Sequence, residues 1–193
     1  MNVVAILLAA GSATRFGSDK LLHALPHAVP IAVQAARHLR IVFESNVVAV
    51  VRPESGELSD RLRKEGCQVV VCDNAAEGMG ASLACAARAA AHADAFVVAL
   101  ADMPFIRSST IAAVRDALAA GAPLVAPYFR ARRGHPVGIS AKFRSELEAL
   151  RGDEGAKKIV AANEASLVKV PVGDPGVLRD IDTPQDLVPR AIV

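Results

Sequence analysis

The sequence predicts a three-layer α/β fold, a mostly parallel sheet with helices on both faces. Short apolar runs rich in β-branched residues recur along the chain, and stretches of helix-forming residues lie between them. Strand–helix alternation over about 130 residues is typical of parallel sheets with helical crossovers. Apolar residues make up 52% of the chain and aromatic residues only 4%. A sizeable core can therefore be buried, built mainly from Ala, Val, Leu and Ile.

The predicted elements follow one another in a regular order through the first two thirds of the chain. We expect strands buried on both faces at Val3–Leu8, Val47–Val51, Val69–Val71, Phe96–Leu100 and Leu124–Ala126. Helices are expected between them at Pro30–Arg40, Glu57–Glu65, Met79–Ala91 and Ser108–Ala120. Gly66 and Gly121 are placed to end two of these helices.

The last third is less regular, with a loop at Phe129–Pro136, helices near Ala141–Leu150 and Ala156–Ala162, and a strand at Ser166–Val170. The length of 193 residues is ordinary for one domain, so we expect residues 1–193 to form a single one.

Charge and cysteine content exclude several classes of protein. The net charge is only +2, from 22 Lys+Arg against 20 Asp+Glu, so neither a nucleic acid nor a membrane is an expected partner. Cys67, Cys72 and Cys85 form no CxxC pair, which argues against disulfides and zinc. The first apolar run has no basic region before it and is too short to span a bilayer. We therefore expect a cytoplasmic protein with reduced thiols.

A glycine-containing loop at residues 8–20, LAAGSATRFGSDK, follows the first strand directly. In open α/β sheets ligands bind beyond the carboxyl ends of the strands, and backbone N–H groups of such loops bind anions. Arg15 and Lys20 add the two cations that a triphosphate needs. The spacing matches neither GxxxxGK nor GxGxxG. The alternative is a solvated turn with two surface charges.

This loop resembles the LAAGxSxRxGxxK signature of nucleotidyltransferases, and most closely that of the molybdenum cofactor cytidylyl- and guanylyltransferases. The matching positions are Leu8, Ala9, Ala10, Gly11, Arg15, Gly17 and Lys20, whereas Ala13 replaces a serine. The resemblance continues at residues 77–83 (EGMGASL), 101–104 (ADMP), 134–137 (GHPV), 152–157 (GDEGAK) and 180–187 (DIDTPQDL). The glycine–proline–leucine segment that usually follows the lysine is missing. The resemblance implies a Rossmann-like fold of the nucleotide-diphospho-sugar transferase type.

Two aspartates are the expected metal ligands. Asp102 follows a predicted strand, and Mg²⁺ takes one or two carboxylates together with phosphate oxygens and water. The resemblance places the metal on Asp102 and Asp182. Each could instead cap a helix, Asp102 the one starting near Ser108 and Asp182 a short final one, and Asp180 is a rival to Asp182. Asp153, in a glycine turn, favours a solvated or capping role.

Base and acceptor sites are expected on other loops. Gly78, Gly80 and Ser82 open a helix and could read the edge of a nucleotide base, or serve as ordinary helix capping. By analogy with the family, His135 lies on the acceptor side. A basic cluster beside it (Arg130, Arg132 and Arg133) could capture an anionic acceptor or be a solvated face.

The resemblance implies a Mg²⁺-dependent transfer of CMP from CTP to molybdopterin, with release of pyrophosphate. Lys20, Arg15 and Asp102 would be catalytic, and Leu8 to Gly11 would complete the nucleotide site. A recipient molybdoenzyme or its chaperone would be a partner. The alternatives are a guanylyltransferase of the same cofactor, using GTP, and a nucleotide-binding regulator that has lost catalysis. Ala10, in place of a glycine usual in the guanylyl branch, favours a pyrimidine base.

Overall fold

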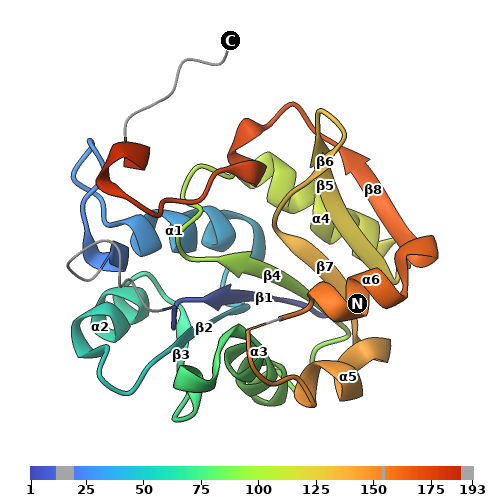
Figure 1. Cartoon of the computed structure of the whole chain (residues 1–193), viewed down its shortest axis with the longest axis horizontal. Helices are drawn as coiled ribbons and strands as arrows, with labels where there is room; N and C mark the ends of the chain where they lie inside the picture. Colours follow the sequence, from blue (N-terminus) through green and yellow to red (C-terminus); the bar gives the residue numbers. More distant parts are fainter. Residues whose placement is uncertain (12–19, 154, 188–193) are drawn as a thin grey trace.

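A computed structural model describes residues 1–11, 20–153 and 155–187. Its strands form one eight-stranded sheet in the order β3-β2-β1-β4-β7-β5-β6, with β8 paired to β5 (Figure 1). The strands are β1 Val3–Leu8, β2 Val47–Val51, β3 Gln68–Val71, β4 Ala95–Leu100, β5 Leu124–Phe129, β6 Arg132–Arg133, β7 Val137–Ser140 and β8 Leu167–Pro171.

The sheet is mostly parallel, as predicted. Strands β1 to β4 pair in parallel, and β5 pairs in parallel with β8. The exception is β7, which lies antiparallel between β4 and β5. Strand β6, which forms a hairpin with β5, lies where a loop was expected, and β7 lies where no element was assigned. Both are short, and neither follows a crossover helix, so strand–helix alternation could not reveal them.

Six α-helices accompany these strands in the described part of the chain. They are α1 Ile31–Phe43, α2 Gly56–Lys64, α3 Met79–Ala89, α4 Ser108–Ala119, α5 Arg144–Glu148 and α6 Lys157–Ala162. The helix predicted near Ala141–Leu150 is instead a 3-10 turn, Ala141–Phe143, followed by the short α5. Within residues 1–11, 20–153 and 155–187, no helix is long and apolar enough to cross a membrane.

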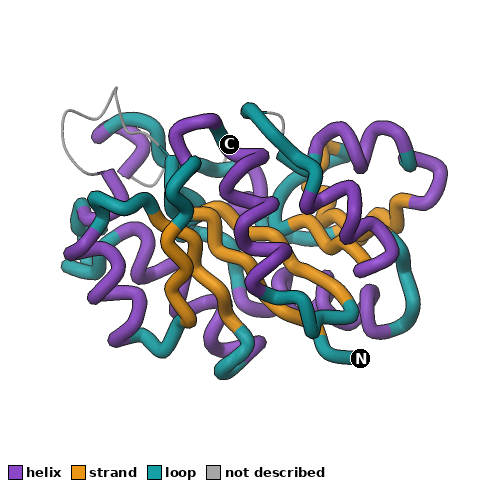
Figure 2. The backbone as a smooth tube through the Cα atoms, turned by 90° about the horizontal axis from the view of Figure 1, so that it is seen from below, coloured by secondary structure: helices purple, strands orange, loops and turns teal. Residues whose placement is uncertain are grey.

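Alternate residues of the strands build two separate cores. Val3, Ala5 and Leu7 of β1 belong to one core, which is shared with α1, α2 and α4. Val4, Ile6 and Leu8 belong to the other, which is shared with α3, α5 and α6. The strands run through the middle of the molecule, with helices around them (Figure 2). This is the predicted three-layer arrangement.

One prediction about burial was wrong. Strand β3 was expected to be buried on both faces, but Gln68 and Val71 are exposed and Val69 and Val70 are only half-buried. The reason is its position: β3 pairs only with β2 and so forms an edge of the sheet.

The two glycines predicted to end helices do so by the same hydrogen-bonding pattern. Gly121 follows α4 with φ +98°, and its N–H donates to the Leu118 carbonyl at 2.8 Å. The next N–H, of Ala122, donates to the Ala117 carbonyl at 3.1 Å. This is the Schellman arrangement, which needs a left-handed residue at this position. Gly66 ends α2 in the same way.

The conformation of Gly121 predicts the effect of a substitution. We expect Gly121→Ala to lower the free energy of unfolding by about 1–2 kcal/mol, because an L-residue is strained in the left-handed region. Nothing lies within 4 Å of an added Cβ there, so the loss would come from the backbone alone. Gly56→Ala is the control, since its Cβ is also free of contacts and its φ is not positive. Thermal unfolding compares them; equal melting temperatures would contradict the expectation.

Candidate functional site

The candidate site lies where the strand order reverses. Strands β1 and β4 are adjacent and parallel, with Leu8 opposite Leu100 at their carboxyl ends. From β1 the chain continues outward to β2 and β3, and it then returns to β4 on the other side of β1. Such a reversal leaves a crevice beyond the strand ends, where α/β proteins bind their ligands.

A cavity of about 300 Å³ occupies this crevice. Residues from six places in the sequence line it, several of them predicted site residues. The lining residues are Leu8, Ala10, Gly11, Lys20, Leu21, Arg52, Ala75, Ala76, Gly78, Met79, Ser82, Leu100, Asp102, Asp153 and Asp182. The structure therefore brings together the predicted loop, the start of α3 and both predicted metal ligands.

Lys20 connects the two aspartates. Its Nζ lies 3.0 Å from Oδ2 of Asp102 and 3.2 Å from Oδ1 of Asp182. The exposed fraction of the side chain is 12% for Lys20, 26% for Asp102 and 52% for Asp182. Burial lowers the pKa of Lys20, but the charges and hydrogen bonds of both aspartates outweigh this effect and the net shift is upward. Lys20 is therefore a protonated ammonium at neutral pH.

Asp102 does not cap a helix. Helix α4 has Arg107 at its N-cap position without a side-chain capping bond. A different carboxylate, the buried Asp174, accepts hydrogen bonds from the Arg107 N–H at 2.9 Å and from the Thr110 hydroxyl at 2.8 Å. The Asp102 carboxylate is thus left to face the cavity. Its backbone carbonyl accepts a hydrogen bond from the Ile181 N–H at 2.9 Å, which anchors the C-terminal segment beside it.

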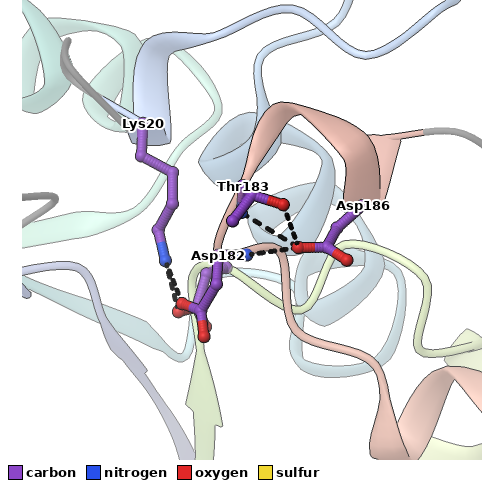
Figure 3. Close-up of polar contacts among 5 residues, drawn as sticks. Lys20, Asp182, Thr183 and Asp186 are labelled. Atoms are coloured by element: carbon purple, nitrogen blue, oxygen red, sulfur yellow. Dashed lines mark hydrogen bonds and ion pairs between the residues drawn. The ribbon is translucent and has the colours of Figure 1, made fainter. Parts of the chain in front are cut away.

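Asp182 is also relieved of a capping role. The 3-10 turn Pro184–Leu187 follows it, but the residue that satisfies the free N–H groups there is Asp186. Its Oδ2 accepts from the N–H groups of Asp182 at 3.3 Å and Thr183 at 2.9 Å, and from the Thr183 hydroxyl at 2.8 Å. Figure 3 shows Asp186 folded back onto Thr183 while Lys20 points toward Asp182 from another segment. Asp180, the rival, is exposed and is not among the residues lining the cavity.

The glycine loop contributes its first residues and Lys20 to the described site. Leu8, Ala9 and Ala10 are buried, and Gly11 is exposed. Arg15, with the rest of 12–19, lies outside the described residues. Arg52, which sequence reasoning missed, donates from Nε to the Ala10 carbonyl at 2.6 Å. It directly follows β2, so the rule that singled out Asp102, a charged residue just after a strand, would have found it.

Close backbone packing explains why glycines stand at the start of α3. The Gly80 N–H donates to the Gly152 carbonyl at 2.6 Å, and a Cβ on Gly80 would lie 2.7 Å from the Arg151 carbonyl oxygen. Gly78, at φ +123°, has no space for a Cβ either. The glycines thus let the turn at 151–153 pack against α3, which brings Asp153 to the cavity wall. The Ser82 hydroxyl lies 3.5 Å from the Gly78 carbonyl.

A second cavity of about 250 Å³ adjoins the first. The two share Leu8, Met79, Leu100 and Asp153 as wall residues. The rest of the second wall is mostly apolar, with three basic side chains, and consists of Leu83, Val98, Arg133, His135, Val137, Ala156, Lys157 and Val160. All three arginines of the predicted basic cluster are exposed, and Arg133 lines the second cavity, whereas Arg130 and Arg132 line neither of the two.

His135, which lines this second cavity, has one unsatisfied polar atom. Its Nδ1 is buried and has no hydrogen-bond partner among the described residues. Burial, reinforced by the charge of Arg133 and opposed by that of Asp180, lowers the pKa of His135, so the ring is neutral at pH 7. A buried polar atom without a partner is costly to the folded state.

The donor set fits a hard divalent cation that is shared with phosphates. Residues 1–11, 20–153 and 155–187 contain no group of three or more His, Cys, Asp or Glu side chains that could hold a metal alone. Mg²⁺ does not need such a group, because it uses one or two carboxylates plus phosphate oxygens and water. The described wall of the first cavity carries three carboxylates against two cations. A triphosphate bound there would need additional positive charge.

Comparison with known proteins agrees with this chemistry. The family model described as "MobA-like NTP transferase domain" matches residues 5–167. A curated relative, nicotine blue oxidoreductase of Paenarthrobacter nicotinovorans, is 28% identical over 195 residues, which cover 96% of this chain and 94% of the relative.

Solved structures share the fold. Rv0371c of Mycobacterium tuberculosis superposes with a TM-score of 0.83 at 24% identity, covering 96% of each chain, and it has also been solved with manganese. Molybdopterin-guanine dinucleotide biosynthesis protein A of Archaeoglobus fulgidus has a TM-score of 0.66 at 21% identity, covering 95% of this chain and 94% of its own. The predicted nucleotide-diphospho-sugar transferase type of fold is confirmed.

The close approach at Gly80 can be tested by substitution. We expect Gly80→Ala to cost about 1–3 kcal/mol of stability, because the added Cβ forces the carbonyls of Arg151 and Gly152 away. The same shift moves Asp153, so nucleotide affinity measured by calorimetry is expected to fall as well. Gly173→Ala, whose Cβ would meet nothing within 4 Å, is the matched control. If both variants melt and bind alike, the packing role assigned to Gly80 is wrong.

Proposed function

The chain belongs to the family of MobA-like NTP transferase domains, and from this premise we propose that it transfers CMP from CTP to the phosphate of a molybdopterin-type acceptor. It is a nucleotidyltransferase, and the base and the acceptor are the proposed part. We also propose that residues 1–193 act as one domain. Asp182 lies beyond the matched residues 5–167 and yet contacts Lys20, which supports this extent.

The observation that carries the proposal is the position of the Lys20, Asp102 and Asp182 cluster beside two joined cavities. The cluster and the predicted base-reading residues line one cavity, and a histidine lines the other together with mostly apolar residues. A transfer between two substrates requires both to be held side by side with their reacting groups in line. The four residues that line both cavities support such an arrangement.

The chemistry needs positioning and charge neutralisation rather than a general base. A phosphate monoester has a second pKa of about 6, so the acceptor is already an anion at neutral pH. One of its oxygens attacks the α-phosphorus of CTP, a new P–O bond forms, and the bond to pyrophosphate breaks. The obstacle is repulsion between two anions, which cations around the phosphates remove.

The chain's own residues divide this task. Lys20 and Arg15 stabilise the negative charge of the departing pyrophosphate, and the backbone of Leu8 to Gly11 approaches the nucleotide. Asp102 and Asp182 would hold Mg²⁺, which supplies charge neutralisation at the phosphates when bound. A divalent ion is consistent with the manganese-containing structure of a protein of this fold.

The second cavity is proposed as the acceptor site. Its mostly apolar wall suits a flat ring system, and Arg133 and Lys157 suit an anionic group. By analogy with the family, His135, which lines this cavity, would make one hydrogen bond to the acceptor.

CTP is favoured over GTP by the resemblance and by Ala10, whose side chain takes up room beside the loop. A methyl-sized difference is worth about 1–3 kcal/mol, or about 10- to 200-fold in kcat/KM. The runner-up is a guanylyltransferase of the same cofactor. A regulator without catalysis is the third candidate, because Ala13 replaces a serine and Ala101 replaces a glycine of the family pattern.

Pyrophosphate release from each of the four NTPs, with and without molybdopterin, tests the proposal. We expect release only with Mg²⁺ or Mn²⁺ and acceptor together, and at least about tenfold higher kcat/KM for CTP than for GTP.

Asp102→Asn should abolish pyrophosphate release with the fold intact, because the substitution is nearly isosteric and removes one carboxylate charge.

Three outcomes would contradict the proposal at different levels. A preference for GTP favours the guanylyltransferase. Nucleotide binding without pyrophosphate release favours the regulator. Oxidation or reduction of nicotine blue, in the absence of any NTP-dependent reaction, would favour the activity for which the relative from P. nicotinovorans is named.

A further inference from the structure

The ammonium of Lys20 lies between the carboxylates of the two predicted metal ligands, Asp102 and Asp182. It is within 3.2 Å of a carboxylate oxygen of both Asp102 and Asp182. A Mg²⁺ ion bound by the same oxygens would lie about 2.0–2.1 Å from them. Two cations cannot share this position, since their mutual repulsion in a partly buried site is large. Metal binding therefore requires the ammonium to leave.

The two carboxylates keep their places by bonds that do not involve Lys20. The Asp102 backbone is tied to Ile181 through a hydrogen bond of 2.9 Å. Asp182 is held by Asp186, which accepts from its N–H at 3.3 Å. The pair thus remains assembled when the lysine moves. Lys20 itself has a flexible four-carbon stem, and its side chain lines the cavity in which the triphosphate is proposed to lie.

We propose that the Lys20 ammonium occupies the metal position between the two carboxylates in the nucleotide-free protein and moves to the phosphates when a nucleotide binds. This inference rests on the proposed function. Nucleotide and metal then enter together: the triphosphate draws the ammonium away from the carboxylates, and the freed carboxylates take the divalent ion. Metal alone binds weakly, because it must first displace a cation already hydrogen-bonded to both ligands.

Substitution of Lys20 is expected to change metal affinity in the opposite direction from substitution of an ordinary metal ligand. Removing the ammonium should strengthen metal binding in the absence of nucleotide, because two adjacent carboxylates are left without a cation. We expect Lys20→Met to bind Mn²⁺ about tenfold more tightly than the unmodified protein, within the range usual for coupled sites. Lys20→Gln, a second neutral variant, should behave in the same way.

Calorimetric titration of the nucleotide-free proteins with Mn²⁺ measures this effect. Lys142→Met is the matched control, because Lys142 follows Ser140, which pairs with Ala95 at the opposite end of β4 from the site. Its Mn²⁺ affinity should equal that of the unmodified protein. The double variant Lys20→Met, Asp102→Asn should lose the increase in Mn²⁺ affinity. Such a loss would show that the additional affinity comes from this carboxylate pair.

Equal or weaker Mn²⁺ binding by folded Lys20→Met and Lys20→Gln would overturn the inference. Circular dichroism establishes that each variant is folded. The outcome is separable from that of the proposed function, because pyrophosphate release is measured on the unmodified protein. If the unmodified protein releases pyrophosphate but the variants bind Mn²⁺ no more tightly, the transferase stands and the displacement of Lys20 by the metal is wrong. If the variants bind Mn²⁺ more tightly but no pyrophosphate is released, the displacement stands and the transferase is wrong.

Discussion

The parallel pairing of β1 with β4 is the constraint on which the candidate site depends. These strands end side by side, and the chain leaves them toward opposite edges of the sheet. The glycine loop follows one strand, and Asp102 follows the other. Because β1 and β4 are buried in both cores, their ends form a rigid base for groups that must meet. Charged side chains can lie in the crevice between the segments that follow β1 and β4 without disturbing the packing of the two cores.

The C-terminal segment completes the site, and a backbone hydrogen bond ties it to the end of β4. The hydrogen bond from Ile181 to Asp102 brings Asp182 to a strand end about 80 residues earlier in the chain, and Asp186 then frees its carboxylate. Lys20 balances the resulting pair of like charges. Lys20, Asp102 and Asp182 thus form one ion-paired cluster, in which the ammonium offsets the repulsion between the two carboxylates. Substrate phosphates and a divalent ion can reorganise that unit without moving the backbone.

Much of this could be predicted from the sequence, for identifiable reasons. The long apolar runs of β1, β2 and β4 report burial directly, and Gly66 and Gly121 mark helix ends because left-handed residues are rare. Strand β7 could not be predicted, since four residues without a crossover carry no periodic signal. The Lys20 contact with Asp102 and Asp182 also lay beyond prediction: motifs placed these residues in one site but could not show that they neutralise one another. The glycines of α3 were interpreted as base readers, whereas their tight packing against 151–153 depends on a distant turn.

We propose that nucleotide and metal meet at the cluster of Lys20, Asp102 and Asp182. A crystal structure with Mn²⁺ and the non-hydrolysable analogue α,β-methylene-CTP tests this. We expect anomalous scattering from manganese between the carboxylates of Asp102 and Asp182, with the Lys20 ammonium moved onto the phosphates. Manganese bound away from these carboxylates, or a nucleotide bound outside the crevice between β1 and β4, would contradict it.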